Sequence, residues 1–508
     1  MKFSDAARQY SHLTRTENGA VALSTTGSPL VDLFASIGAM RNKDIETMFQ
    51  MFGSALAEDA LLATKMLFYA RNVRGGLGER DTFRKLLTML SFERPETVAK
   101  NLENIPYFGR FDDLYALVGT PVEEDMWSYL RHVVAQDIEN LRAGNVNSLS
   151  LAGKWMKSVN ASSAETRMLG QKTARALGMS DKTYRKTLSE LRKALQVVER
   201  KMSANQWDQI DYEHVPSNAM KVYREAFKRH DPTFVTEYIK AVEAGTKEIK
   251  AGTLFPYDIL MAGGIDENRG NHFTIKNDPV LEAQWKALPN YVQGEHNILV
   301  MADTSGSMTM YNGQPIATSI GLSLYFAERN KGVFKDLMLT FSSTPQFVDV
   351  SGETLKQKIS RIPAIVDNTN LESAFNLILT TAIKNNVPQE EMPVSLLVIS
   401  DMQFDQGTVQ GGGYWSDSGF VRGSDLDTFH EKMEQKYRSA GYEMPVLIYW
   451  NVEGRANTFQ ANQKKQNVIL VSGQSASSFR DVLSNIGKTP YDFMVETLDN
   501  PMYDRVVL

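Results

Sequence analysis

The chain has 508 residues, of which 42% are hydrophobic and 23% charged, with a net charge of −5 and no cysteine. This length exceeds what one ordinary hydrophobic core holds, so two or more domains are expected. The missing cysteines exclude disulfides, thiolate catalysis and cysteine-ligated zinc, and the negative net charge excludes a uniformly basic surface. No signal-peptide core or membrane-spanning run is present in the sequence, which favours a cytoplasmic protein without membrane contact.

The first half of the chain has helical periodicity. Residues 1–29 are polar and rich in Thr, Ser and Gly, and predict an N-terminal arm. From residue 30 onward apolar side chains recur every three or four positions, and short Pro or Gly breaks separate the runs. This pattern is typical of stacked helix pairs of the HEAT kind. We therefore predict an α-helical repeat domain over residues 30–290, whose last part, residues 252–291, has the irregular composition of a linker.

Residues 71–81 form a Gly-rich turn flanked by three arginines. Backbone amides and guanidinium groups of such a turn are suited to hold a phosphate. The turn lacks the Lys-Ser/Thr ending of a nucleotide-binding P-loop, so we favour a helix stop with structural ion pairs to Glu79 and Asp81.

Residues 154–201 are strongly basic. They contain twelve lysines and arginines against four carboxylates, a local net charge of +8 within a chain of net charge −5. Such an asymmetry indicates a polyanionic partner, because clustered Lys and Arg bind phosphates and release counterions. Trp155 and Tyr184 lie in this segment, either as stacking platforms for unpaired bases or as buried helix anchors. A solvated charged face is the other interpretation of the whole segment.

The C-terminal part alternates strands and helices. Strands are expected at residues 298–302, 336–341, 346–350, 394–400, 446–450 and 468–471, and helices at residues 315–329, 371–383, 431–438, 475–486 and 491–498. Because this alternation is typical of a doubly wound sheet, we predict an α/β domain over residues 291–508.

Oxygen-bearing side chains follow two fully apolar strands of this domain. Asp303, Ser305 and Ser307 come after the first strand, Asp401 comes after the strand at 394–400, and Thr369 directly precedes a helix. Open α/β sheets place their binding sites at the carboxyl ends of strands, and carboxylates with hydroxyls suit a hard divalent cation, Mg²⁺ or else Mn²⁺. The alternative for the first three residues is a capping run that opens the next helix.

The set of Asp303, Ser305, Ser307, Thr369 and Asp401 resembles the complete metal-ion-dependent adhesion site of a von Willebrand factor A domain. The resemblance implies that the two serines bind the cation directly, and that the threonine and the acids bind it directly or through water. A partner's carboxylate or phosphate would then complete the coordination shell. The sequence departs from this family in a long Gly-rich loop after Asp401, at residues 407–424, whose length is sufficient to cover the site.

A helical basic half ahead of such a domain resembles the Ro (TROVE) family of ring-shaped RNA-binding proteins and two-part relatives. The matching stretches are residues 67–71, 74–76, 78–80, 152–158, 184–186, 191–192 and 399–402. The resemblance implies that small structured or misfolded RNA binds the helical half. It also implies that the residues that contact RNA are basic residues of this half. These residues are Lys154, Lys157, Arg185, Lys186 and Arg192.

Two functions of different classes follow from these patterns. The first is a non-enzymatic RNA-binding ring protein, a scaffold or quality-control chaperone for small or misfolded RNA within a ribonucleoprotein. The second is an assembly scaffold whose cation site grips an acidic residue of a protein partner, without RNA. An enzyme is the weakest interpretation, because Asp401 and Asp405 have no paired His, nucleophile elbow or P-loop to define a reaction.

Overall fold

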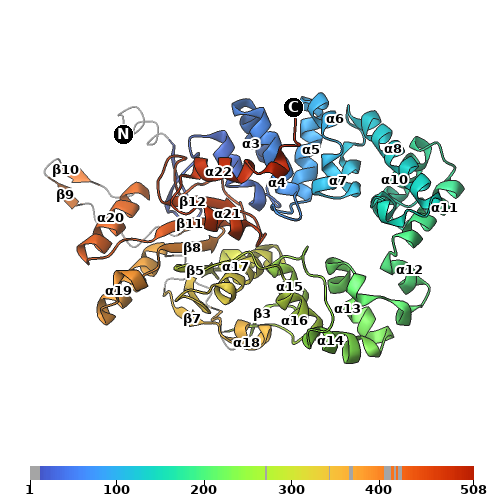
Figure 1. The fold of residues 1–508 in the computed structure, drawn as a ribbon. Helices are drawn as coiled ribbons and strands as arrows, with labels where there is room; N and C mark the ends of the chain where they lie inside the picture. Colours follow the sequence, from blue (N-terminus) through green and yellow to red (C-terminus); the bar gives the residue numbers. More distant parts are fainter. Residues whose placement is uncertain are drawn as a thin grey trace. The chain divides into compact units, whose positions relative to one another are not determined.

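The computed structural model describes residues 12–268, 272–341, 344–364, 370–404, 414–416, 419–421 and 426–508. The chain folds into two compact units (Figure 1). Unit 1 comprises Met1–Glu58 and Ala251–Leu498, and unit 2 comprises Asp59–Lys250 and Asp499–Leu508. Unit 2 is helical and unit 1 is an α/β unit, which confirms the predicted combination of the two architectures. No helix in the described ranges has the length and apolarity needed to cross a membrane.

The elements of unit 1 alternate helices and strands after residue 298. Ahead of them in sequence are β1 (Leu13–Arg15), β2 (Val21–Leu23), α2 (Pro29–Phe34), α3 (Ile45–Glu58), α15 (Pro256–Ala262), β3 (Asp266–Asn268), β4 (His272–Thr274) and α16 (Pro279–Lys286). The remainder are β5 (Ile298–Asp303), α17 (Met310–Arg329), β6 (Leu337–Phe341), β7 (Phe347–Asp349), α18 (Leu355–Ile359), α19 (Leu371–Asn385), β8 (Ser395–Ser400), β9 (Tyr414–Ser416), β10 (Gly419–Val421), α20 (Leu426–Ser439), β11 (Val446–Asn451), β12 (Val468–Ser472), α21 (Ser478–Ser484) and α22 (Pro490–Leu498).

A six-stranded sheet organises unit 1, with strand order β12-β11-β8-β5-β6-β7. The first five strands are parallel, and the short edge strand β7 pairs antiparallel with β6. The chain passes from β5 to β6 on one side and returns to β8 on the other, so β5 and β8 flank the topological switch point. Open α/β sheets bind ligands at the carboxyl ends of the strands at this point.

Helices cover both faces of the sheet, which is why β5 and β8 are apolar at nearly every position. On one face, Met301 and Val398 belong to a cluster with Phe375 of α19 and Tyr437 of α20. On the other face, α17 packs against β5, β6 and β8. Trp450 of β11 lies there against Phe479 of α21, with ring centres 4.7 Å apart. The predicted strands and helices of this half are confirmed within a few residues.

The regular part of α17 begins beside Pro315, as predicted. Tyr311, Asn312 and Gly313 lie ahead of it with positive φ values of 52°, 59° and 75°. Only Gly tolerates this left-handed backbone without steric cost, so the turn that leads from β5 into α17 stores strain at two residues.

Residues 13–29 are part of the fold instead of a separate arm. β1 and β2 form a hairpin, and the backbone N–H of Leu23 donates to the carbonyl of Phe459 at 2.8 Å. The following helix α2 buries Phe34, whose ring meets Phe493 of α22 edge-on at 5.6 Å. These apolar contacts place residues 12–58 with the sheet, whereas the predicted boundaries assigned residues 30–58 to the helical domain.

The segment predicted as a linker, residues 252–291, also belongs to unit 1, and its described residues are 252–268 and 272–291. It contains α15, α16 and the β3–β4 hairpin. Trp285 of α16 is 1% exposed and donates its indole N–H to Glu328 of α17. The predicted helical domain of residues 30–290 therefore exceeds the compact helical unit, because both of its ends bury apolar side chains beside the sheet.

Unit 2 consists of helices throughout its described length. They are α4 (Ala60–Arg71), α5 (Asp81–Glu93), α6 (Pro95–Lys100), α7 (Asn104–Phe108), α8 (Glu123–Arg142), α9 (Ala152–Trp155), α10 (Ala164–Ala176), α11 (Asp181–Ala194), α12 (Val198–Ser203), α13 (Ser217–His230), a π-helical segment at Phe234–Ile239 and α14 (Lys240–Glu243), with short 3₁₀ turns between them. Tyr503, near the end of the chain, stacks on Phe108 at 5.4 Å and ties the C-terminus to this unit.

The Gly-rich turn after α4 serves the packing of unit 2. The Arg71 guanidinium is 2% exposed and pairs with Asp113 at 2.7 Å, and Arg80 pairs with Asp81 at 3.1 Å. Ion pairing was predicted for this turn, but the buried partner is Asp113, which is distant in sequence. A side chain at Gly76 would lie 2.2 Å from the carbonyl oxygen of Tyr69, so glycine is required there by close backbone approach.

Candidate cation site and basic surface

The loop after β5 brings the first three predicted ligands together. Asp303 is fully buried, and its Oδ1 accepts the backbone N–H of Ser305 at 2.9 Å. The hydroxyls of Ser305 and Ser307 lie 3.1 Å apart. One carboxylate and two hydroxyls therefore share a turn of five residues at the carboxyl end of the strand.

The end of β8 adds a second carboxylate beside this loop. Asp401 is 1% exposed and directly follows β8, the strand that pairs with β5. Its Oδ1 accepts the backbone N–H of Gln403 at 3.1 Å, and its Oδ2 is buried without a hydrogen-bond partner among the described residues. The hydroxyl of Ser400, a residue that the sequence analysis did not select, donates to Oδ2 of Asp303.

The two carboxylates are electrostatically costly without a counter-charge. Burial, and after it the negative charge of Asp401, raise the pKa of Asp303 to about 7. Burial likewise raises the pKa of Asp401, against the opposing effect of its hydrogen bonds. Two acids that share one buried position attract a cation, because a cation relieves both the burial cost and the mutual repulsion.

Arg455 supplies part of the missing positive charge. Its Nη1 lies 3.8 Å from Oδ2 of Asp401, and the same guanidinium forms an ion pair with Glu17 from the turn of the β1–β2 hairpin. Glu453 is a further buried acid after β11, with a pKa raised to about 7 mainly by burial. Asn42 donates a hydrogen bond to it at 3.0 Å. The carboxyl ends of β5, β8 and β11 are thus acidic on balance.

The residues present fit a hard divalent cation. Asp303, Asp401 and the Ser305–Ser307 pair are oxygen donors of the type that Mg²⁺ and Mn²⁺ prefer. No group of three or more His, Asp or Glu side chains converges among the described residues, so hydroxyls would have to supply part of the coordination shell. The third predicted loop cannot be added, because Thr369 lies outside the described residues, as does Asp405.

The capping alternative for this loop is not supported by its hydrogen bonds. Ser305 directly precedes a 3₁₀ turn, Gly306–Thr309, but its side chain makes no capping hydrogen bond. The Ser305 hydroxyl instead meets the hydroxyl of Ser307.

The Gly-rich loop at residues 407–424 is described only at β9 and β10, which pair as a short antiparallel hairpin.

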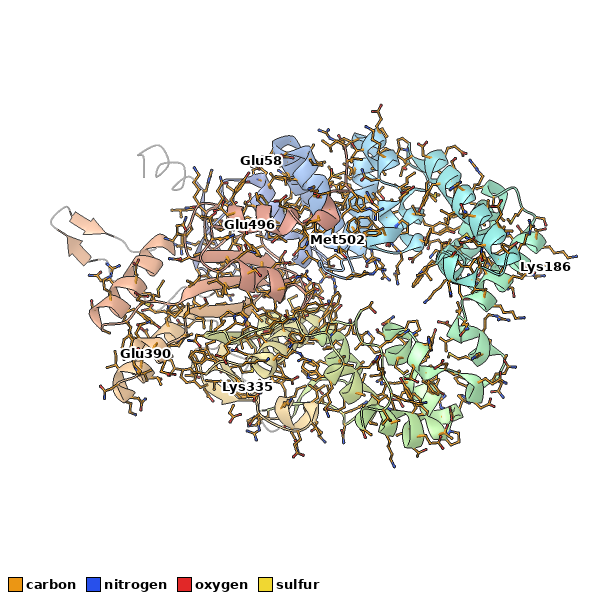
Figure 2. The ribbon with its side chains drawn as sticks, viewed as in Figure 1. Glu58, Lys186, Lys335, Glu390, Glu496 and Met502 are labelled. Carbon is orange, nitrogen blue, oxygen red and sulfur yellow. The ribbon has the colours of Figure 1, made fainter. Side chains whose placement is uncertain are left out.

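The five predicted RNA contacts lie within 39 residues of unit 2, but they differ in exposure. Arg185 and Lys186 are exposed on α11, where Lys186 projects from the helix (Figure 2). Lys154 and Lys157 are half-buried, with their ammonium groups 5.3 Å from the ring centre of Trp155 and 5.6 Å from that of Tyr115. Burial lowers the pKa of Lys154.

Arg192 organises the neighbouring backbone. Its Nε donates to the carbonyl of Gly153 at 3.0 Å, its Nη1 to the Ser158 hydroxyl at 3.0 Å, and its Nη2 to the carbonyl of Met156 at 2.9 Å. The guanidinium therefore clamps residues 153–158 against α11. Its contacts are neutral oxygens, so they leave its charge available.

The two aromatic residues of the basic segment have different environments. Tyr184 is 1% exposed and donates its hydroxyl to the carbonyl of Lys157, so it is a buried helix anchor. Trp155 is half-buried, and the Arg110 guanidinium lies 4.3 Å from its ring centre. Sequence reasoning missed Arg110 and also Arg200, which lies beside Arg192 in a hollow of unit 2. The only signal for Arg200 was its membership of the basic run.

Fold and site together define a two-part protein, an all-helical basic unit joined to a parallel α/β unit with an oxygen-rich site at its switch point. Residues 16–132 and 125–296 match the family described as Domain of unknown function (DUF2828), and residues 297–495 match Domain of unknown function (DUF7788). Because the first match covers more than half of the chain, the protein belongs to the DUF2828 family. It is also similar to Uncharacterized protein L728 of Acanthamoeba polyphaga mimivirus, with 25% identity over 536 residues, 97% of this chain and 89% of that protein.

Proposed function

We propose that the protein binds RNA through a basic surface of unit 2, which we define as Lys154, Lys157, Arg185, Lys186, Arg192 and Arg200. The observation that carries the proposal is that Arg185, Lys186 and Arg200 are exposed and that their side chains form no hydrogen bond or ion pair with any described residue. Unneutralised cations in one small area attract a polyanion, and phosphate is the ligand for which guanidinium groups have the best geometry.

In this proposal the protein is a non-enzymatic scaffold or chaperone for small structured or misfolded RNA. The helices of unit 2, in HEAT-like pairs, carry the RNA, and the α/β unit is a von Willebrand factor A-like domain. The strand order of unit 1 and the position of Asp303 and Asp401 at the switch point support this assignment. The half-buried Trp155 supports contact with unpaired bases, which stack on aromatic rings.

The experiment is a mobility-shift titration of a small structured RNA against the full chain at several salt concentrations. We expect binding that weakens steeply with salt, because phosphate contacts release counterions. The charge reversals Arg185→Glu and Lys186→Glu should weaken binding of every RNA sequence alike. The matched control is Lys335→Glu, a reversal of an exposed cation of unit 1. Equal affinity of all three variants and wild type would contradict RNA binding at this surface.

A second candidate function is favoured by the buried Oδ2 of Asp401, which accepts no hydrogen bond from the described residues and faces Arg455 Nη1 at 3.8 Å. A divalent cation held by Asp303, Ser305, Ser307 and Asp401 would keep an open coordination position for a carboxylate of a protein partner. The chain's own residues do the rest, since Ser400 orients Asp303 and the backbone of Gln403 orients Asp401.

Isothermal titration with Mg²⁺ and Mn²⁺ tests this second function. We expect wild type to bind one ion and Asp303→Ala to bind none. The control variant is Asp349→Ala, an exposed acid at the edge of the same sheet, which should bind as wild type does. If Asp303→Ala abolishes partner capture while RNA binding persists, the cation site serves protein assembly. If both variants titrate like wild type, there is no cation site at Asp303.

A further inference from the structure

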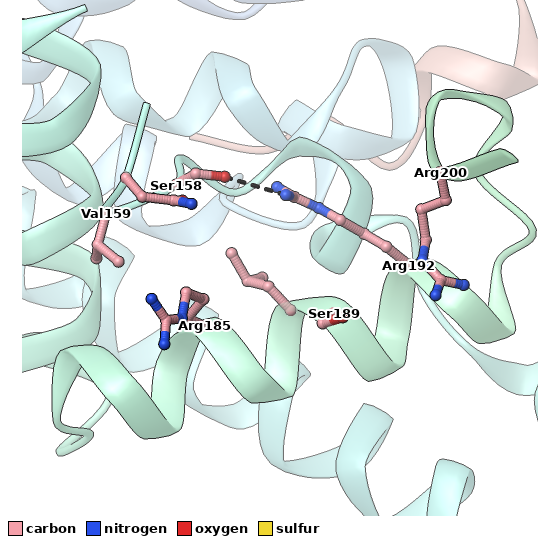
Figure 3. Close-up of a pocket in the computed structure, with 8 residues that line it drawn as sticks. Ser158, Val159, Arg185, Ser189, Arg192 and Arg200 are labelled. Atoms are coloured by element: carbon pink, nitrogen blue, oxygen red, sulfur yellow. Dashed lines mark hydrogen bonds between the residues drawn. The ribbon is translucent and has the colours of Figure 1, made fainter. Parts of the chain in front are cut away.

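A hollow of about 250 Å³ lies between α11 and the segment that follows α9 (Figure 3). Its walls are formed by Ser158, Val159, Asn160, Arg185, Leu188, Ser189, Arg192 and Arg200. Arg185 and Ser189 are one helical turn apart on α11, so they present their side chains on the same side of the helix. Residues 158–160 form the opposite wall.

The lining of this hollow is selective for an anion. It contains three guanidinium groups and two hydroxyls, and no carboxylate. Arg185 and Arg200 have no partner among the described residues. Arg192 donates to the Ser158 hydroxyl across the hollow, as the dashed line in Figure 3 shows, and thereby holds that wall in place. Two unpaired guanidinium groups beside a preformed wall are suited to donate hydrogen bonds to the two non-bridging oxygens of a phosphodiester.

A second, more open hollow of about 600 Å³ adjoins the first, because Arg192 and Arg200 line both. Its other lining residues are Lys154, Trp155, Val197, Glu199, Ser203 and Ala204. One ring, one carboxylate and aliphatic side chains make this hollow less cationic than the first. Such a lining suits a nucleoside, which offers a flat base for stacking and polar edges for hydrogen bonds.

We infer that the two hollows together bind one nucleotide step of a single RNA strand, with the phosphate in the first hollow, which Arg185 and Arg200 line, and the adjoining nucleoside beside Trp155 in the second. The inference rests on the proposed RNA binding and specifies that this part of the basic surface binds single-stranded RNA. A duplex is excluded, because its bases are stacked inside and cannot enter a hollow beside Trp155. Single-stranded ends or loops of a structured RNA present the required step.

The test compares two double variants that each remove two positive charges. Arg185→Gln with Arg200→Gln removes the two unpaired guanidinium groups from the lining of the first hollow. Lys182→Gln with Lys193→Gln is the matched control, since both lysines are exposed on α11 and neither lines either of these two hollows. Affinity for a fluorescent oligouridylate is measured by anisotropy at constant salt. We expect the arginine pair to weaken binding about tenfold or more, since each charge-assisted hydrogen bond is worth more than a general charge effect. Equal losses in both double variants would overturn the inference.

Two further probes separate the ligand from other sources of phosphate. Inorganic phosphate and uridine monophosphate are titrated as competitors of the oligouridylate. We expect Trp155→Leu to weaken binding of the oligouridylate and to leave competition by inorganic phosphate unchanged. If uridine monophosphate binds wild type as tightly as the strand does, the site is for a free nucleotide and the inference is overturned.

The outcomes also distinguish this inference from the proposed function. If a structured RNA binds with the salt dependence described above but the arginine pair and the lysine pair behave alike, RNA binding stands and the hollow is not its phosphate site. If no RNA of any form binds wild type, the proposed RNA binding and the inference about the two hollows are both contradicted. Circular dichroism and thermal unfolding of each variant establish that the fold is retained.

Discussion

Asp113 is the most constrained charged residue of unit 2. It is fully buried, and its two oxygens accept from Arg71 Nε and Arg84 Nε, each at 2.7 Å, and from the backbone N–H of Arg110 at 2.9 Å. Removal of one partner from a buried ion pair leaves an uncompensated charge, which costs more than the intact pair contributes.

We therefore expect Asp113→Ala to lower the free energy of unfolding of unit 2 by about 3–5 kcal/mol. Asp81→Ala is the matched control, because Asp81 is 65% exposed in its pair with Arg80 and such pairs contribute about 0–1 kcal/mol. Urea unfolding followed by circular dichroism measures both. A loss of similar size in the two variants would contradict a structural role specific to the buried network.

Asp481 of α21 makes the stability of unit 1 dependent on pH. Burial raises its pKa to about 6, and Arg480 opposes the shift. A raised folded-state pKa means that the folded chain holds a proton that the unfolded chain has lost, so stability falls as pH rises from about 4 to 6 and is constant above. We expect Asp481→Asn, which cannot ionise, to gain about 1–3 kcal/mol relative to wild type between pH 4 and pH 7.5. Urea unfolding at both pH values measures the difference, and a difference that does not vary with pH would contradict it.

At the level of secondary-structure elements, the β1–β2 hairpin is positioned against the cation-site loop. Thr16 donates its hydroxyl to the carbonyl of Phe404 at 2.6 Å. Gln403 accepts the backbone N–H of Glu17 at 2.9 Å on its side chain and the amide of Asn18 at 2.7 Å on its carbonyl. Three hydrogen bonds from one turn thus restrain the residues that follow Asp401.

We expect Thr16→Ala combined with Asn18→Ala to accelerate amide hydrogen exchange of residues 402–404 about tenfold or more, because each lost hydrogen bond contributes about 0.5–1.5 kcal/mol. Ser24→Ala is the control, since among the described residues its hydroxyl donates to the carbonyl of His12 and does not contact residues 402–404. Mass spectrometry of peptides after hydrogen exchange measures the exchange rates in both variants. Unchanged exchange in the double variant would mean that the hairpin does not restrain the loop.

At the level of the two units, a cation should act on unit 1 alone. A ligand that binds only the folded state stabilises it by about 2.7 kcal/mol at one hundred times its dissociation constant. With saturating Mg²⁺ we expect slower hydrogen exchange in β5 and β8 and no change in α11. Asp303→Asn should lose this response, whereas Asp349→Asn should keep it. Slower exchange in α11 upon addition of Mg²⁺ would instead indicate cation binding in unit 2.

The sequence alone was sufficient for the class of each half. Continuous apolar runs predicted β5 and β8, because a strand covered on both faces is apolar at each position, and this signal is local. The same runs placed Asp303 and Asp401 at strand ends, and Pro315 marked the start of the regular part of α17. Helical periodicity likewise identified unit 2 as helical.

Only the tertiary structure decided which side chains meet. Ser400 and Arg455 reach the two site acids from positions that no spacing rule selects, and Arg71 pairs with Asp113 across 42 residues. The unit boundaries were also decided there, since α2 and α16 belong to the helical part of the sequence pattern but bury their apolar side chains within unit 1. Local patterns encode the type of an element, whereas the partner of a charge or of an apolar face depends on contacts between residues far apart in the chain.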